Sequence, residues 1–264
     1  MKLAFVGCGN MARAMIQGIL DNGLASADDI YGSNATQAHA AETRELLGIH
    51  TTTNNAEAVA HGQIIFLCVK PQQYSAVLKE IGDQLVGNKV LVTIAPGKSM
   101  AWVQQEAGRP LKVVRTMPNT PALVGEGFTS YCPNQAVEPE ELSQIEALLG
   151  SFSTIMRLDE NMIDAASAVA GSAPAFTYMF IEALADGAVA EGMPRDKALA
   201  AAAQTVLGSA RMVQESGKHP GTLKDEVCSP GGSTIAGVQA LEDAAFRGAV
   251  IEAIRATTEK ARSL

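Results

Sequence analysis

A glycine-rich loop near the start of the chain has the residue types and spacing that hold a phosphate group. Gly7-Cys8-Gly9-Asn10-Met11-Ala12 follows an apolar run and precedes a helical pattern, which is the context that a GxGxxA motif requires. Gly7 permits a tight turn, Gly9 lets the backbone approach a pyrophosphate, and Ala12 lets the helix pack closely. The pyrophosphate then lies at the positive end of the helix. The loop predicts a dinucleotide site; a glycine-rich turn without a ligand is the alternative.

The turn Gly32-Ser33-Asn34-Ala35-Thr36 stands where the cofactor is usually selected. NAD-specific sites place a carboxylate about 20 residues past the glycines to bind the ribose hydroxyls, and this turn has none. Ser33 and Asn34 can donate hydrogen bonds to a 2′-phosphate, which favours NADPH. The Arg that often accompanies that phosphate is missing, since Ala35 follows Asn34, so NADH stays a second cofactor.

A second segment with chemical potential is Val227-Cys228-Ser229-Pro230-Gly231-Gly232-Ser233-Thr234. Its Pro-Gly-Gly turn opens directly into a helical pattern, and the first N–H groups of a helix are free to bind a carboxylate. Ser229, Ser233 and Thr234 add three hydroxyls. Ordinary N-capping by Ser or Thr is the alternative, although a cap requires neither two glycines nor three hydroxyls. On chemistry alone, an anion site and a plain cap both stay open.

The elements that position these segments change between the two halves of the chain. In the first half, apolar runs at residues 2–6, 29–32, 63–69, 89–94, 112–117 and 128–132 alternate with helical stretches at 10–20, 37–47 and 75–81. This alternation predicts a parallel sheet with helices on both faces. From about Asn161 the pattern is helical, with long helices expected over 174–191, 195–215 and 241–262. We place the boundary near Asp159, which gives domains over residues 1–159 and 160–264.

Composition and charge exclude several classes of function. The net charge is −8 and no dense stripe of Lys and Arg is present, which disfavours nucleic-acid binding. Four scattered Cys and four His, without CxxC spacing, predict no metal site and suit a reducing compartment. No apolar run reaches the roughly 18 residues that span a bilayer, and the stretch before Cys8 is too short for a signal sequence. The sequence predicts a cytoplasmic protein that binds no membrane.

Several motifs together resemble those of one enzyme family. The Ser-Pro-Gly-Gly-Ser-Thr segment looks like the signature of pyrroline-5-carboxylate reductases, and other segments match the same family in the right order along nearly the whole chain. These segments are Gly7-Cys8-Gly9-Asn10-Met11-Ala12, Val69-Lys70-Pro71-Gln72, Arg115-Thr116-Met117-Pro118-Asn119-Thr120-Pro121 and Gly171-Ser172-Ala173-Pro174-Ala175.

The resemblance implies an α/β Rossmann dinucleotide-binding domain, then an all-α domain through which two chains intertwine into a homodimer. Dimers in this family often assemble further, into decamers. The implied reaction is the reduction of L-1-pyrroline-5-carboxylate to L-proline by NADPH, the final step of proline biosynthesis. The protein supplies position and electrostatics, because the cofactor carries the hydride chemistry.

The resemblance also implies roles for single residues. Val69, Lys70 and Pro71 would contact the nicotinamide ribose beside Asn54. The residues after the strand at 112–117 would frame the ring, and Thr234 would orient the ring nitrogen of the substrate and supply or relay a proton. Together with the loop and turn above, the cofactor set is Gly7, Gly9, Asn10, Met11, Ser33, Asn34, Asn54, Val69, Lys70, Pro71, Met117, Pro118 and Asn119. The substrate set is Val227, Ser229, Pro230, Gly231, Gly232, Ser233 and Thr234.

Two other interpretations stay open. A β-hydroxyacid dehydrogenase shares this layout but uses a Lys on the helix between its domains, and the stretch at residues 171–178 contains none. A non-catalytic dinucleotide sensor that dimerises through its helical half would need the cofactor loop but not the Pro-Gly-Gly-Ser-Thr segment. Such a sensor would bind the dinucleotide without turning over an imine.

Overall fold

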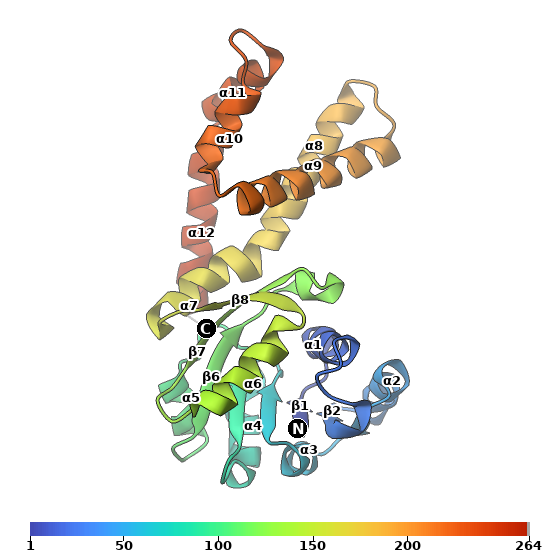
Figure 1. Ribbon diagram of the computed structural model, residues 1–264, viewed down its shortest axis with the longest axis vertical. Coiled ribbons are helices and arrows are strands. Elements are labelled where there is room, and N and C mark those ends of the chain that lie inside the picture. Colours follow the sequence, from blue (N-terminus) through green and yellow to red (C-terminus); the bar gives the residue numbers. More distant parts are fainter. Residues whose placement is uncertain (263–264) are drawn as a thin grey trace. The chain divides into compact units, whose positions relative to one another are not determined.

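The computed structural model describes residues 1–262, which divide into two compact units (Figure 1). The first unit is Met1–Gly171 together with the chain from Thr257, and the second is Ser172–Ala256. Helix α7 (Glu160–Ser167) contacts strands of the first unit. The boundary between the two compact units therefore lies after Gly171, whereas the sequence pattern changes near Asp159.

The first unit is built on an eight-stranded sheet in the order β3-β2-β1-β4-β5-β6-β7-β8. Neighbouring strands are parallel except β6 and β7, which are antiparallel. The strands are β1 (Leu3–Val6), β2 (Ile30–Ser33), β3 (His50–Thr52), β4 (Ile64–Leu67), β5 (Val90–Thr93), β6 (Lys112–Met117), β7 (Gly127–Pro133) and β8 (Ser153–Arg157).

Helices cover both faces of this sheet, as predicted. Alternate residues of a strand point to opposite faces, so Leu3 and Phe5 pack with α1, α2 and α6, whereas Ala4 and Val6 pack with α3, α4 and α5. The helices are α1 (Asn10–Asp21), α2 (Gln37–Leu47), α3 (Asn55–His61), α4 (Tyr74–Ile81), α5 (Met100–Glu106), α6 (Pro139–Gly150) and α7.

The sheet departs from the predicted parallel arrangement at one pair of strands, since β7 is antiparallel to β6. Strand β6 ends at Met117 and β7 begins at Gly127, and the segment between them holds only the short 3-10 turn Thr120–Val124. A parallel return needs a crossover of a dozen or more residues, so this shorter connection turns the chain back. The strands β3 and β8 were not predicted either.

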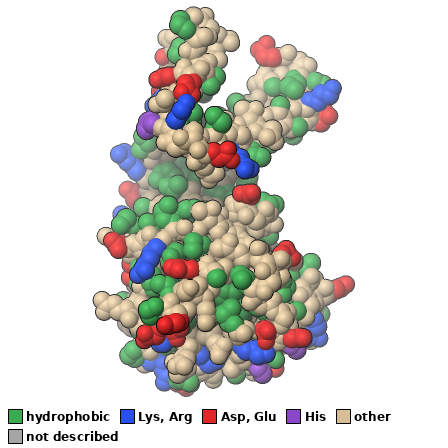
Figure 2. Space-filling model, in the orientation of Figure 1, with side chains coloured by type: hydrophobic (Ala, Val, Ile, Leu, Met, Phe, Trp, Pro, Cys, Tyr) green, Lys and Arg blue, Asp and Glu red, His purple; other side chains and the backbone are tan. Residues whose placement is uncertain are grey.

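The second unit is helical, as predicted, and has a very small core. Its helices are α8 (Ala173–Ala190), α9 (Arg195–Ser216), α10 (Pro220–Val227), α11 (Ser233–Asp243) and α12 (Phe246–Arg262), the last of which runs on into the first unit. The helix expected over 241–262 is interrupted between α11 and α12, where Ala245 adopts φ 57°. The core of this unit is the three alanines Ala185, Ala198 and Ala202. Figure 2 shows hydrophobic side chains at the surface of these helices.

One helical stretch among the described residues, Glu160–Ala190, is long and apolar enough to cross a membrane by length and composition. It comprises α7, a π-helical turn at Ala168–Ser172, and α8. A single such helix is weak evidence, because apolar helices outside membranes pass the same test. That the chain binds no membrane stays a prediction.

Candidate functional site

The loop between β1 and α1 needs each of its glycines for a different reason. Gly7 has φ +91°, and a Cβ there would lie 2.7 Å from Val69 Cγ1 and 2.9 Å from Val69 N. Only glycine fits such a conformation and such a contact. A Cβ on Gly9, by contrast, would meet no atom within 4 Å. Gly7 is therefore required by the fold, and Gly9 leaves open space at the start of α1.

The N-terminus of α1 is free to receive an anion. Gly9 is the N-cap residue, and no side chain caps the helix. The amides of Gly7 and Cys8 donate to Ser33 O at 3.1 and 2.9 Å, which fixes the loop against the end of β2. The amides of Asn10 and Met11 begin the helix, where backbone N–H groups have no intrahelical partner. This cradle fits the pyrophosphate of a dinucleotide.

A pocket of about 240 Å³ opens beside this loop, at the carboxyl ends of β1, β2 and β4. Ligands of open α/β sheets bind at this edge. The lining residues are Gly7, Cys8, Gly9, Ser33, Asn34, Ala35, Asn55, Cys68, Val69, Lys70, Gln73 and Val77. The structure therefore brings the predicted residues Gly7, Gly9, Ser33, Asn34, Val69 and Lys70 together around one cavity.

The side chains of Ser33 and Asn34 are already engaged within the protein. Ser33 Oγ donates to Asn55 Oδ1 at 2.7 Å, and Asn34 Nδ2 donates to Cys8 O at 3.1 Å. The remaining polar atom, Asn34 Oδ1, is buried without a hydrogen-bond partner. The Ser33 hydroxyl thus donates its one hydrogen within the protein. The Asn34 amide has a second N–H group beside the one bound to Cys8 O, so its donation to a 2′-phosphate stays a prediction.

Two adjacent asparagines have different positions. Asn54 accepts from Glu57 N at 3.2 Å and caps α3, while Asn55 lines the pocket and donates to Glu80 Oε2 at 2.9 Å. Sequence reasoning selected Asn54 and missed Asn55. Because β3 was not predicted, the start of the following helix could not be located to the residue.

A buried tyrosine holds the strand ends on which the pocket depends. Tyr74 Oη donates to Leu67 O at 2.6 Å and accepts from Ile94 N at 3.1 Å. These bonds join the ends of β4 and β5, and burial raises the pKa of the Tyr74 hydroxyl. The bonds stabilise the strand end from which the segment Val69–Pro71 follows. Lys70 in this segment is exposed and precedes the 3-10 turn Pro71–Gln73. No sequence pattern predicts these hydrogen bonds of Tyr74.

At the end of β6, Pro118 is buried and Met117 is partly exposed. Asn119 Nδ2 donates to Ala170 O at 3.0 Å, and Asn119 Oδ1 accepts from Phe128 N at 2.8 Å. Both ends of this amide are thus bound to the backbone, and the contact of Met117, Pro118 and Asn119 with a nicotinamide ring stays a prediction.

The predicted anion site of the second unit is the turn between α10 and α11. Gly231 has φ +68°, and Gly232 N donates to Ser229 O at 3.1 Å. Gly232 is the N-cap of α11 and no side chain caps this helix, which contradicts the alternative of an ordinary Ser or Thr cap. Ser233 and Thr234 form the first turn and are exposed. Val227 and Pro230, at the end of α10 and in the turn, are exposed as well.

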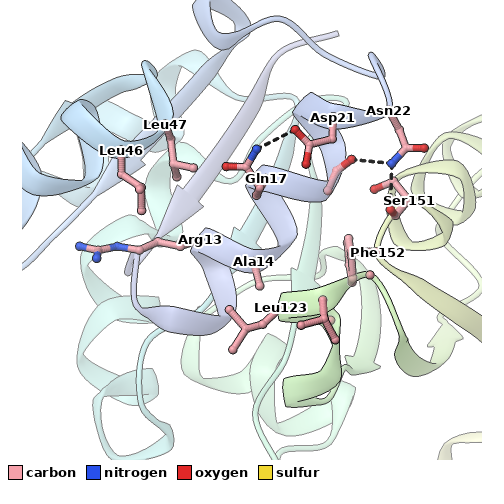
Figure 3. A pocket seen from close by; sticks show the side chains of 14 residues that line it. Arg13, Ala14, Gln17, Asp21, Asn22, Leu46, Leu47, Leu123, Ser151 and Phe152 are labelled. Carbon is pink, nitrogen blue, oxygen red and sulfur yellow. Dashed lines mark hydrogen bonds between the residues drawn. The ribbon is translucent and has the colours of Figure 1, made fainter. Parts of the chain in front are cut away.

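Another pocket of the first unit, about 390 Å³, contains few free polar groups (Figure 3). Gln17 Nε2 donates to Asp21 Oδ1 at 2.7 Å, and Asn22 Nδ2 donates to Ser151 O at 3.1 Å. Arg13 is bound by Glu42 at 2.8 Å. None of the predicted site residues lines this pocket. Within the described part of the chain, no group of three or more His, Cys, Asp or Glu could hold a metal ion.

Two family models match the chain in the same order as its two halves. "NADP oxidoreductase coenzyme F420-dependent" matches residues 2–97. "Pyrroline-5-carboxylate reductase dimerisation" matches residues 160–264.

Similar proteins cover the whole chain. Pyrroline-5-carboxylate reductase of Escherichia coli is 42% identical over 263 residues, which is 100% of this chain and 98% of that protein. The enzyme of the same name from Arabidopsis thaliana is 38% identical, over 100% of this chain and 95% of that protein. The crystal structure of Plasmodium falciparum pyrroline carboxylate reductase with NADP bound is similar with a TM-score of 0.91 and 32% identity, over 100% of this chain and 97% of that one.

Proposed function

Because this chain belongs to the pyrroline-5-carboxylate reductase family, we propose that its first unit holds the dinucleotide and its second unit holds the substrate. The chain reduces L-1-pyrroline-5-carboxylate to L-proline with NADPH, the final step of proline biosynthesis. One observation supports this division best: α1 and α11 both begin at a glycine N-cap that no side chain caps. Each unit therefore offers an anion site, one suited to a pyrophosphate and one to a carboxylate.

In the first unit, the amides of Asn10 and Met11 bind the pyrophosphate, and Val69, Lys70 and Pro71 contact the nicotinamide ribose. Asn55 replaces Asn54 beside them, because Asn55 lines the pocket. Met117 and Pro118 face the ring. When bound, NADPH supplies the hydride that reduces the C=N bond.

In the second unit, the amides of Ser233 and Thr234 bind the substrate carboxylate, with the Ser229 hydroxyl beside them. The Thr234 hydroxyl forms a hydrogen bond with the ring nitrogen of the substrate and orients the ring. A protonated imine already accepts hydride readily, so the site needs orientation more than a strong acid. In agreement, the segment at residues 227–234 contains no His that could act as such an acid.

The Thr234 hydroxyl is tested by two substitutions. We expect Thr234→Ala to lower kcat/KM for the substrate about 100-fold, within the range found for a lost, well-placed catalytic donor. Thr234→Ser should keep most of the activity, since it keeps the hydroxyl. The measurement is the loss of NADPH absorbance with pyrroline-5-carboxylate, with proline identified as the product. Near-normal turnover by Thr234→Ala would exclude this role.

The second unit forms a homodimer, which its family model indicates. An apolar pocket of about 580 Å³ is lined by Phe176, Met179, Phe180, Ala183, Leu184, Leu241, Phe246, Ala249, Val250 and Ala253. A unit whose core is three alanines cannot bury this surface by itself, so a second copy covers it. We propose further assembly to a decamer and a cytoplasmic location. The molar mass in solution from light scattering tests the assembly.

A further inference from the structure

Asn119 lies in the motif that faces the nicotinamide ring, yet its side chain binds protein on both sides. The residue is only 8% exposed. Its amide joins Phe128 N, at the start of β7, to Ala170 O. Each polar atom of this side chain therefore already has a protein partner that fixes the direction of the amide.

The carbonyl that Asn119 binds belongs to the π-helical turn Ala168–Ser172. A π turn interrupts the regular hydrogen-bond ladder of a helix, and such turns are often found at functional sites. The packing division of the molecule falls within this turn, between Gly171 and Ser172. Asn119 therefore holds the point at which the chain leaves the first unit.

The same turn also packs against Met117, the residue proposed to face the ring. A Cβ on Gly171 would lie 3.3 Å from Met117 Cε and 3.6 Å from Ser167 Oγ. The helix before the turn is fixed by the same strand, since Arg115 binds Asp164 at 2.5 Å and Glu160 at 3.5 Å. Alternate residues at the end of β6 and just beyond it, Arg115, Met117 and Asn119, thus contact α7 and the π turn.

We propose that Asn119 is a positioning residue for hydride transfer: it holds the π turn against Met117 and so fixes the position of this ring-facing residue. The inference rests on the proposed place of the nicotinamide ring beside Met117 and Pro118. Reacting groups must be placed to within a fraction of an ångström, and a displacement of about 1 Å can cost 100-fold in rate. Loosening this bond should slow the chemical step without weakening the cofactor.

The test compares Asn119→Ala and Asn119→Asp with a matched control, Asn134→Ala. Asn134 makes the same kind of bridge at the other end of β6, accepting from Val113 N at 3.2 Å and donating to Leu111 O at 2.8 Å. We expect both Asn119 variants to lower kcat about 10-fold or more, with KM for NADPH within about twofold and a larger isotope effect with deuterated cofactor. Asn119→Asp keeps the acceptor for Phe128 N and isolates the bond to Ala170. Asn134→Ala should change neither kcat nor the isotope effect.

Hydrogen exchange gives a readout that needs no substrate. Amides of residues 168–172 should lose protection in the Asn119 variants and keep it in Asn134→Ala. Faster exchange with unchanged kcat would overturn the positioning role and leave the proposed function intact. A rise in the NADPH dissociation constant that matches the fall in kcat would show a direct cofactor contact and would also overturn it. If Asn119→Ala does not fold, Asn119→Asp and Gly171→Ala, which presses on Met117, carry the test.

Discussion

Two glycines in the cofactor loop are required for different reasons, and substitution should separate them. Gly7→Ala places a Cβ against Val69 in a left-handed conformation and should lower the free energy of unfolding by about 2–4 kcal/mol. Gly9→Ala meets no atom and should cost less than about 1 kcal/mol while it weakens NADPH binding. Urea unfolding and cofactor titration measure both effects. Equal losses of stability in the two variants would contradict the conclusion that the fold requires Gly7 but not Gly9.

Cys8 makes stability depend on alkaline pH. Burial raises the pKa of its thiol from 9.0 to about 12, so above pH 9 the unfolded chain loses this proton before the folded chain does. The unfolded state is then favoured, and the free energy of unfolding should fall as the pH rises from 9 towards 12, by up to about 1.4 kcal/mol per pH unit. Urea unfolding at about pH 8 and about pH 10 measures the slope. Cys8→Ala should reduce it; an unchanged slope would contradict this assignment.

The buried ion pair between β6 and α7 should matter far more than an exposed one. The Arg115 side chain is 4% exposed and binds Asp164, so Asp164→Ala leaves a buried charge with one fewer partner and should cost about 3 kcal/mol. The matched control is Glu215→Ala on α9, where the pair with Arg211 is exposed and should contribute almost nothing. Chemical unfolding measures the free energy of unfolding of both variants. Similar losses of stability in Asp164→Ala and Glu215→Ala would contradict the expectation.

Most elements of the first unit could be predicted because their signals are local. The strands at β1 and β4 are continuous apolar runs, and α2 has a Thr36 cap and a Gly48 stop. β3 could not be predicted, since His50–Thr52 is short and polar and depends on pairing with β2. The direction of β7 depends on the length of a connection rather than on composition.

The residues of the site were predicted where a backbone requirement shows in the sequence, as at Gly7 and Gly231. Hydrogen bonds between distant segments do not show in this way. Asn55, which binds Ser33 from α3, was not selected, and Asn119 was selected without any sign of its bond to Ala170 far along the chain. Residue type alone cannot reveal whether a side chain already has a partner, so Ser33 was assigned a donor role although its hydroxyl donates to Asn55.

The whole molecule should be stable only as an assembly. The second unit buries three alanines but exposes Met179, Val250 and Ile251. We expect the midpoint of thermal unfolding to rise with protein concentration, because association and folding are linked. Val250→Glu, within the apolar pocket, should yield monomers in light scattering. Leu46→Glu, at a position that is also exposed but lies on α2, should stay assembled. Loss of assembly in both variants would point to general destabilisation instead.

The division of ligands between the two units is tested most directly by a pair of variants, Gly9→Val and Gly232→Val, measured for both ligands. In Gly9→Val the added side chain enters the open space at α1, while in Gly232→Val the added Cβ meets Ser229 Oγ. We predict that Gly9→Val weakens NADPH about 10-fold or more and that Gly232→Val raises KM for pyrroline-5-carboxylate by a similar factor, each leaving the other ligand within about twofold. If either variant weakened both ligands equally, or if Gly232→Val weakened only NADPH, the proposed division would be wrong.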